Sequence, residues 1–203
     1  MADAGRVIAG TARGVRLAAP GEGTRPLGDR VKQTLFGILD PRLEDARVAD
    51  LYAGSGAGAI EALSRGAASA VLVEKDGGAC RTIAENLRRA RLDDAAQVVR
   101  RDVIAWLTDP AGAGAAGPFD LVLVDPPYAD TAGLVRTLEL VGPHLAQDAV
   151  VVAKHFWRDA PPQRVGMLAV ERDRRFGETA LTFYRRADTP AADRARNEEA
   201  DEA

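Results

Sequence analysis

Cysteine and histidine are scarce in this sequence, which has one Cys and two His among 203 residues. A single cysteine, Cys80, excludes an internal disulfide framework, and so few thiol and imidazole groups argue against a zinc cluster. We therefore expect no metal site and expect Cys80, on a predicted helix, to pack in the core.

Long apolar runs are also missing. No stretch approaches the ~20 apolar residues that span a bilayer, and the N-terminus MADAGRVIAG lacks the apolar segment of a secretory signal. Hydrophobic residues make up 46% and charged residues 28%, which is typical of a soluble globular protein. We expect one sizeable domain, located in the cytoplasm, with no membrane partner.

Charge is unevenly distributed along the chain, whose formal net charge is −3. The segment 187–203 holds six acidic residues and two arginines, so the rest of the chain carries a net charge of +1. An acidic segment without large apolar residues is typical of disorder, and we predict a disordered tail there. Basic residues gather in the first 35 positions, which permits a polyanion-binding surface, although a solvated face is the commoner explanation.

From residue 47 onward, apolar runs alternate with segments of helical periodicity. This alternation predicts a parallel sheet with helices on both faces and strands buried on both faces, and ligands of such sheets bind at the carboxyl ends of the strands. The predicted strands are 47–52, 69–75, 96–102, 119–125 and 149–154. The predicted helices are 58–67, 77–92, 103–107 and 131–145, and 109–119 is predicted to be a loop.

Both ends of the chain depart from this alternation. The runs 166–177 and 178–186 are joined too closely for a crossover helix, so they predict an antiparallel hairpin. Five parallel strands followed by a hairpin is the order of the Rossmann-like methyltransferases. Before the sheet, 6–20 predicts a β-hairpin, and 28–40 predicts a helix with Asp29 as its N-cap.

A glycine-rich loop, DLYAGSGAGAIEAL (50–63), lies between the first strand and its helix. Glycines there permit a tight turn and let a ligand approach backbone N–H groups at the helix start. Glu74, at the end of the second strand, is placed to accept hydrogen bonds from ribose hydroxyls. The alternative is a tight turn beside a surface glutamate.

S-adenosylmethionine and a nicotinamide dinucleotide compete as ligands of this loop. Asp50, four residues before the first glycine, suits the ammonium group of a methionine moiety and would repel a pyrophosphate. Asp102, at the end of the third strand, would accept from the adenine amino group, cap the next helix, or do both. We infer S-adenosylmethionine. The predicted cofactor-binding residues are Asp50, Tyr52, Ala53, Gly54, Ser55, Gly56, Glu74, Lys75, Asp102 and Val103.

The tetrapeptide Asp125-Pro126-Pro127-Tyr128 follows the fourth strand, and its prolines force the chain out of the sheet along a stiff path. An exocyclic amine is a poor nucleophile because its lone pair is delocalised into the base. Acceptors for both N–H groups, outside the base plane, favour the pyramidal nitrogen of the transition state. Asp125 and the Pro126 carbonyl supply these acceptors, and Tyr128 would stack on the base. The alternative is that the prolines only end a strand.

With these residues assembled, the sequence resembles the RsmD family, bacterial small-subunit ribosomal RNA methyltransferases that modify guanine at N2. The resemblance covers residues 6–186 and is carried by RVIAGTARGVRL, GTRPLGDRVKQTLFGIL, DLYAGSGAGAIEALSRGA, LVEKD, VDPPY and RRFGETALTFYRR. It implies a Rossmann-like class I methyltransferase fold with a seven-stranded sheet, and S-adenosylmethionine as donor. It implies 16S rRNA, free or within the 30S subunit or its assembly intermediate, as acceptor.

The resemblance also assigns roles outside the pocket. It implies that the N-terminal hairpin and residues 24–32 grip RNA, which makes Arg13, Arg25 and Arg30 candidate phosphate contacts. Arg30 has an alternative, pairing with Asp29 or with an acidic residue at the edge of the core. Where the family has a leucine this chain has Gly58, which should loosen packing beneath the loop.

We divide the chain into an N-terminal hairpin and helix extension (1–40), a methyltransferase domain (41–186) and a tail (187–203), and expect a monomer. His155, after the fifth strand, either touches substrate or is structural. The alternatives to guanine-N2 methylation are adenine-N6 methylation of DNA or RNA, which the tetrapeptide fits equally, and a catalytically silent RNA-binding protein.

Overall fold

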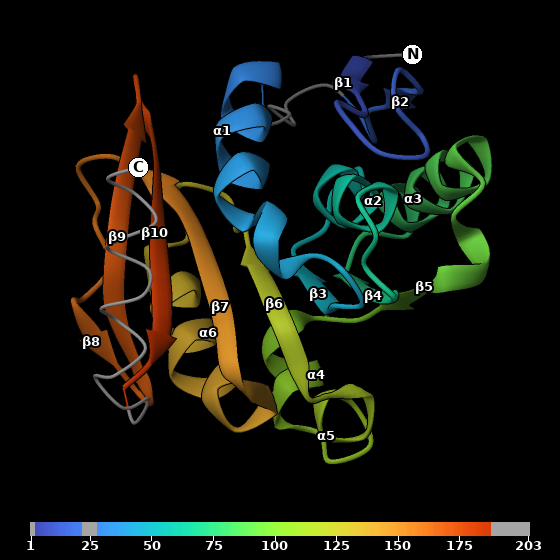
Figure 1. Cartoon of the computed structure of the whole chain (residues 1–203). Helices are drawn as coiled ribbons and strands as arrows, with labels where there is room; N and C mark the ends of the chain where they lie inside the picture. The colour runs from blue at the N-terminus through green and yellow to red at the C-terminus, as the bar shows by residue number, and fades with distance from the viewer. Residues whose placement is uncertain (1–2, 22–27, 188–203) are drawn as a thin grey trace.

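A computed structural model of the chain describes residues 3–21 and 28–187. Within them, a central sheet has the strand order β5-β4-β3-β6-β7-β10-β9-β8, and β1 pairs with β2 in a separate sheet (Figure 1). The strands are β1 (Asp3–Arg6), β2 (Arg16–Ala18), β3 (Arg47–Leu51), β4 (Ser69–Glu74), β5 (Ala96–Arg100), β6 (Phe119–Val124), β7 (Leu145–Phe156), β8 (Arg164–Val165), β9 (Leu168–Phe176) and β10 (Thr179–Arg186). The α-helices are α1 (Asp29–Leu39), α2 (Ala57–Ser64), α3 (Gly77–Ala90), α4 (Val103–Thr108), α5 (Ala113–Ala116) and α6 (Thr131–Val141). Three short 3-10 helices are η1 (Asp40–Arg42), η2 (Asp93–Ala95) and η3 (Gly142–His144).

The central sheet confirms the predicted α/β fold. Strands β5, β4, β3, β6 and β7 are parallel, and β10 runs antiparallel to both β7 and β9. The described part of the sheet has one strand more than the seven expected, because the two-residue β8 pairs with the start of β9. A strand of two residues is too short to produce a recognisable hydrophobic pattern.

Helices cover both faces of the sheet, as predicted (Figure 1). Helices α1, α2 and α3 pack on one face, where Phe36 and Ile60 join a core with Val48 of β3. Helices α4, α5 and α6 pack on the other face, around Trp106 and Leu51. Successive strand residues point to opposite faces, so a strand that is covered on both faces is apolar throughout.

Strand β5 is an exception to the predicted burial. It lies at the edge of the sheet and pairs only with β4, and its residues Gln97 and Arg100 are exposed. The prediction that this strand is buried on both faces is therefore wrong. The predicted loop 109–119 contains the short helix α5, which buries Ala113.

The N-terminal hairpin forms as predicted and packs on the rest of the protein. Its strands pair antiparallel, with Arg6 opposite Arg16. The buried carboxylate of Glu61 in α2 accepts hydrogen bonds from the backbone N–H groups of Ile8 (2.8 Å) and Ala9 (3.1 Å). Val7 and the α2 residue Ile60 lie in the same core. The hairpin is thus held against α2 by polar and apolar contacts together.

Helix α1 confirms the predicted helix but not its predicted cap. The N-cap position is Gly28, and Asp29 is the first helical residue without a side-chain capping bond. Its carboxylate instead pairs with Arg6 at 3.2 Å, and the Lys32 ammonium lies 3.7 Å away. Lys32 is fully buried, and its ammonium donates a hydrogen bond to the Arg6 carbonyl.

Two of the predicted features lie outside the described residues, namely Arg25 and most of the acidic tail (188–203). Among the helices of residues 3–21 and 28–187, none combines the length and the apolarity of a membrane span.

Candidate active site

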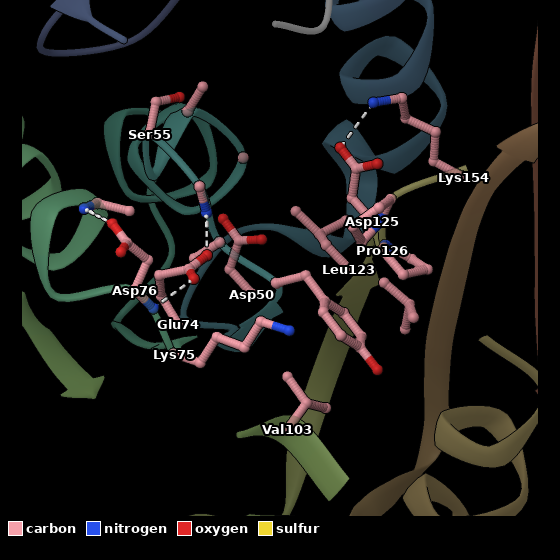
Figure 2. Close-up of a pocket in the computed structure, with 18 of the residues that line it drawn as sticks. Asp50, Ser55, Glu74, Lys75, Asp76, Val103, Leu123, Asp125, Pro126 and Lys154 are labelled. Atoms are coloured by element: carbon pink, nitrogen blue, oxygen red, sulfur yellow. Dashed lines mark hydrogen bonds and ion pairs between the residues drawn. The ribbon is translucent and has the colours of Figure 1, made fainter. Parts of the chain in front are cut away.

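A pocket of about 610 Å³ lies where β3, β4, β6 and β7 end. It brings together residues from distant parts of the chain, including Asp50, Glu74 and Asp125 (Figure 2). Asp102 also lines it. Every predicted cofactor-binding or catalytic residue lines it except Gly56. Parallel strands end at the same edge of a sheet, which is why these four acids meet.

The glycine loop turns sharply between β3 and α2. Gly54 and Gly56 have φ values of 56° and 75°, in the left-handed region that glycine adopts without strain. Gly56 is the N-cap residue of α2 and faces the core, because a Cβ there would lie 3.1 Å from Leu72 Cδ2. Tyr52 adopts φ 62° without being glycine, a strained conformation of the kind found at binding sites.

Asp50 is a buried carboxylate at the end of β3, with 4% of its surface exposed. Its Oδ2 accepts a hydrogen bond from the Ala59 N–H of α2 at 2.9 Å. Burial raises the pKa of Asp50 to about 7; the Ala59 bond opposes the rise, and the nearby Asp125 and Glu74 add to it. A cation entering the pocket would stabilise the ionised form.

Gly58 allows helix α2 to approach Asp50 closely. A Cβ at this position would lie 2.6 Å from Leu123 Cδ1 and 3.0 Å from Asp50 Oδ2. The expectation that Gly58 loosens the packing beneath the loop is therefore wrong. Neighbouring side chains already fill the space that a larger residue would need.

Glu74 is the last residue of β4 and Asp102 is the N-cap of α4, and both accept hydrogen bonds from backbone N–H groups. Glu74 accepts hydrogen bonds from the backbone N–H groups of Gly54 (3.0 Å) and Asp76 (2.9 Å), so it also fixes the glycine loop (Figure 2). Asp102 caps α4 by accepting from Ala105 N–H through Oδ1 at 3.0 Å, as one reading of the sequence predicted. Both carboxylates retain lone pairs for a ligand.

An ion pair forms the other end of the pocket. The Lys154 ammonium at the end of β7 lies 2.8 Å from Asp125 Oδ2 (Figure 2). Their side chains are 13% and 32% exposed, respectively. Burial raises the pKa of Asp125, and Lys154 opposes this shift by favouring the carboxylate.

Tyr128 and the prolines surround this ion pair. The Tyr128 hydroxyl lies 2.7 Å from Thr179 Oγ1, and its ring centroid is 5.5 Å from Lys154 Nζ. The Pro127 carbonyl accepts a hydrogen bond from Asp130 N–H. Among the described residues, no group donates a hydrogen bond to the Pro126 carbonyl, so it keeps its capacity to accept one.

Sequence reasoning missed several residues of the pocket, above all Lys154. The rule that functional groups lie at strand ends would have found it, because it follows the apolar run of the fifth predicted strand. The pocket lining contains six carboxylates and three cationic side chains, so it is net negative: Asp50, Glu74, Asp76, Asp102, Asp125 and Asp130 against Lys75, Arg101 and Lys154. Such a lining favours a cationic ligand and disfavours a pyrophosphate.

The remaining predicted residues lie outside the pocket. Arg13 and Arg30 are exposed, and Asp29 pairs with Arg6 and Lys32 rather than with Arg30. His155 is buried, with Nδ1 2.8 Å from the Phe156 carbonyl and Nε2 2.9 Å from Thr182 Oγ1, which supports the structural reading.

Cys80 is only partly buried, so the expected core packing is wrong. Its thiol donates to the Glu74 carbonyl. No group of three or more His, Cys, Asp and Glu residues in the described ranges is arranged to hold a metal ion.

Comparison with known proteins shows the family. The model of the family described as Conserved hypothetical protein 95 matches residues 5–185. Ribosomal RNA small subunit methyltransferase D of Escherichia coli K12 is 34% identical over 185 residues, which cover 89% of each chain. The protein of the same name from Haemophilus influenzae is 37% identical over 125 residues, 61% of this chain and 63% of the relative.

Solved structures agree with this assignment. A hypothetical protein of Thermus thermophilus, TTHA0928, has a TM-score of 0.73 at 35% identity, covering 88% of this chain and 97% of that chain. SMU.776 complexed with SAH has a TM-score of 0.62 at 11% identity, covering 75% of this chain and 48% of that one, and shows a shared fold. The full-length matches establish that this chain belongs to the RsmD family of ribosomal RNA small subunit methyltransferases.

Proposed function

We propose that this protein transfers a methyl group from S-adenosylmethionine to the exocyclic N2 amine of a guanine in 16S rRNA. The observation that carries the proposal is one pocket that joins Asp50 and Glu74 to Asp125 and Pro126. The first pair suits a cationic nucleoside, and the second suits an amine that must lose its planarity.

The residues of the donor half fit S-adenosylmethionine. Asp50 binds the ammonium of the methionine moiety, Glu74 accepts from the ribose hydroxyls, and Asp102 accepts from the adenine amine. Val103 is the first residue of α4, where backbone N–H groups have no partner within their own helix. When bound, the cofactor supplies an electrophilic methyl group on a sulfonium, a cation that the net negative lining favours.

The acceptor half orients the amine. Asp125 Oδ1 and the Pro126 carbonyl accept hydrogen bonds from its two N–H groups, which concentrates the lone pair on nitrogen as the transition state requires. Lys154 occupies Asp125 Oδ2, so it fixes the carboxylate orientation and keeps it ionised. The methylated amine is positively charged and acidic, and Asp125 lies in position to receive the released proton.

The choice of acceptor rests on family membership, because the Asp125-Pro126 geometry fits the adenine amine equally well. The relatives are named ribosomal RNA small subunit methyltransferases. We propose that the enzyme acts as a monomer in the cytoplasm, on 16S rRNA in the 30S subunit or its assembly intermediate. Exposed Arg13 and Arg30, together with Arg25, contact phosphates. Residues 1–40 then serve as the RNA-contacting extension of the methyltransferase domain.

The test is methyl transfer from labelled S-adenosylmethionine to 30S subunits, and in parallel to deproteinised 16S rRNA, from cells that lack the gene. We expect N2-methylguanosine as the product, with one modified position. N6-methyladenosine as the sole product would contradict guanine as the acceptor and indicate an adenine-N6 methyltransferase. Calorimetry that detects no S-adenosylmethionine binding would instead indicate a silent RNA-binding protein.

A further inference from the structure

Two partly exposed aromatic residues lie at the end of β7, close in sequence to Lys154. Phe156 ends β7, and Trp157 follows it, two and three residues after Lys154. The other tryptophan, Trp106, is buried in the core, as are Phe119 and Tyr184. A tryptophan left partly exposed beside a pocket lacks the usual packing reason for its position.

These rings form a continuous path that starts in the pocket. Tyr128 lines the pocket, and its ring centroid lies 6.3 Å from that of Phe156 at an interplanar angle of 50°. Phe156 lies 6.3 Å from Trp157 at 51°. Both separations fall within the range of interacting aromatic pairs. The path therefore leads from the proposed base position to the protein surface.

Two arginines lie on the last ring of this path. The guanidinium carbon of Arg175, from β9, is 3.6 Å from the Trp157 ring centroid, and that of Arg158 is 4.9 Å away. Both arginines are exposed, and neither forms an ion pair within residues 3–21 and 28–187. A guanidinium that stays cationic and stacked on indole presents a flat, weakly hydrated surface.

The turn between β9 and β10 holds this arrangement in place. The backbone N–H of Trp157 donates to the Glu178 carbonyl at 3.0 Å, and the side-chain Nε of Arg175 donates to the Gly177 carbonyl at 3.0 Å. Backbone contacts thus anchor both stacked residues to one turn. The stack of Arg175 on Trp157 is therefore fixed by hydrogen bonds from two chain segments, β9 and the residues after β7.

We propose that Phe156, Trp157, Arg158 and Arg175, the stacking platform, bind an unpaired RNA base adjacent to the target guanine. This inference rests on the proposed function and deepens it by naming the nucleotide that neighbours the target. A guanine that enters the pocket must leave its helix or loop stack, which separates it from its neighbour. Aromatic rings and arginine planes are the groups on which proteins stack such displaced bases.

A stacking platform of this kind would favour unpaired over paired RNA. Stacking requires an accessible base face, and a base inside a regular duplex offers none. The neighbouring phosphates lie within reach of the two guanidinium groups, which adds salt-dependent affinity. The platform is built from the ends of β7 and β9, whereas Arg13 and Arg30 belong to the N-terminal extension, so it supplies a second RNA contact.

Tryptophan fluorescence tests the platform directly, because the chain contains two tryptophans, Trp106 and Trp157. In a Trp106→Phe background the emission comes from Trp157 alone. Titration with a short single-stranded guanine-containing oligoribonucleotide should quench this emission. A duplex of the same sequence should leave it nearly unchanged. Oligonucleotide binding detected by anisotropy without any change in Trp157 emission overturns the proposal.

Steady-state kinetics on 30S subunits provides a second test. Trp157→Ala should raise KM for the subunit by about tenfold while kcat and S-adenosylmethionine affinity stay unchanged, and Trp157→Phe should retain most of the affinity. Arg175→Gln should also raise KM. Arg174→Gln is the matched control, because this neighbouring exposed arginine points to the opposite face of β9.

An unchanged KM for Trp157→Ala would contradict the stacking platform, and so would an Arg174→Gln effect on KM equal to that of Arg175→Gln. Neither result would contradict the proposed methyl transfer. Absence of rRNA methylation by the unaltered enzyme contradicts the proposed function instead. The fluorescence titration would then still report whether Trp157 binds unpaired RNA.

Discussion

The ammonium of Lys154 lies 2.8 Å from the carboxylate of Asp125, and the two residues come from the ends of neighbouring strands β7 and β6. This contact favours the ionised form of Asp125, the carboxylate that we propose accepts a hydrogen bond from the target amine. Burial alone would favour the protonated carboxyl, which has fewer lone pairs for the amine.

Lys154→Met should therefore shift the acidic limb of the pH–rate profile upward. Without Lys154, nothing opposes the desolvation that raises the pKa of Asp125, so the active carboxylate forms only at higher pH. The variant should lose more activity at pH 6 than at pH 9, as measured by kcat. Lys75→Met, which removes another lysine from the pocket lining, is the control and should leave the limb in place.

Asp125→Ala should reduce kcat by about 100-fold or more, because one of the two acceptors for the amine is lost. Affinity for S-adenosylmethionine, measured by calorimetry, should stay close to that of the unaltered protein. Asp94→Ala removes an exposed carboxylate from η2, outside the pocket, and should change neither quantity. Equal losses of turnover and cofactor affinity in Asp125→Ala would show a structural role for this carboxylate.

Asp50 should make the cofactor-free protein less stable as pH rises. Its pKa is about 7 in the folded protein and 3.8 ordinarily, so between these values the folded state holds a proton that the unfolded state lacks. The free energy of unfolding therefore falls as pH increases from about 4 to about 7. Above pH 7 the buried charge costs the folded state up to about 4 kcal/mol.

Asp50→Asn removes this titration while keeping an oxygen for Ala59 N–H. Urea unfolding at pH 5 and pH 8 should show that the unaltered protein loses about 3 kcal/mol more than the variant over this interval. Equal losses in the two proteins would mean that Asp50 is ionised throughout. The variant should also bind S-adenosylmethionine more weakly, since it lacks the charge that we propose pairs with the ammonium.

Asn86 should be needed for stability because it joins three buried backbone groups. Its Nδ2 donates to the Ala18 and Ser55 carbonyls, each at 2.9 Å, and its Oδ1 accepts from Ala18 N–H at 2.8 Å. Asn86→Leu leaves these groups unpaired and should lower the free energy of unfolding by about 3 kcal/mol. Glu85→Ala, one residue away and partly exposed, should cost much less by the same urea titration, because solvent screens its ion pairs with Arg88 and Arg89.

Gly58→Ala and Gly37→Ala should change stability in opposite directions. Alanine favours a helix over glycine by about 1 kcal/mol at either position. At Gly37 a Cβ meets nothing within 4 Å, so that variant should be stabilised. At Gly58 the contact with Leu123 outweighs the helix gain by about 1 kcal/mol, and displacement of Asp50 should weaken cofactor binding. Thermal unfolding of the pair separates packing from helix propensity.

Local patterns were sufficient to predict most of the elements. Periodicity identified the five parallel strands, and the prolines of Asp125-Pro126-Pro127-Tyr128 marked the end of β6 because they cannot continue a strand. Hydrophobic patterns average over several residues, so they missed β8 and did not reveal that β5 is an edge strand. Helix α1 was predicted correctly, but whether its cap was Asp29 or Gly28 depended on contacts with Arg6 and Lys32.

The sequence by itself determined the α/β fold, the glycine loop and the position of the tetrapeptide at a strand end, because each depends on residues that are close in the chain. Only the tertiary structure decided which distant groups touch. The Asp125 and Lys154 ion pair, the packing of Gly58 against Leu123, and the stacking of Arg175 on Trp157 all join separate elements. Such contacts are set by strand order and by the directions of the side chains, neither of which is encoded in any single stretch of sequence.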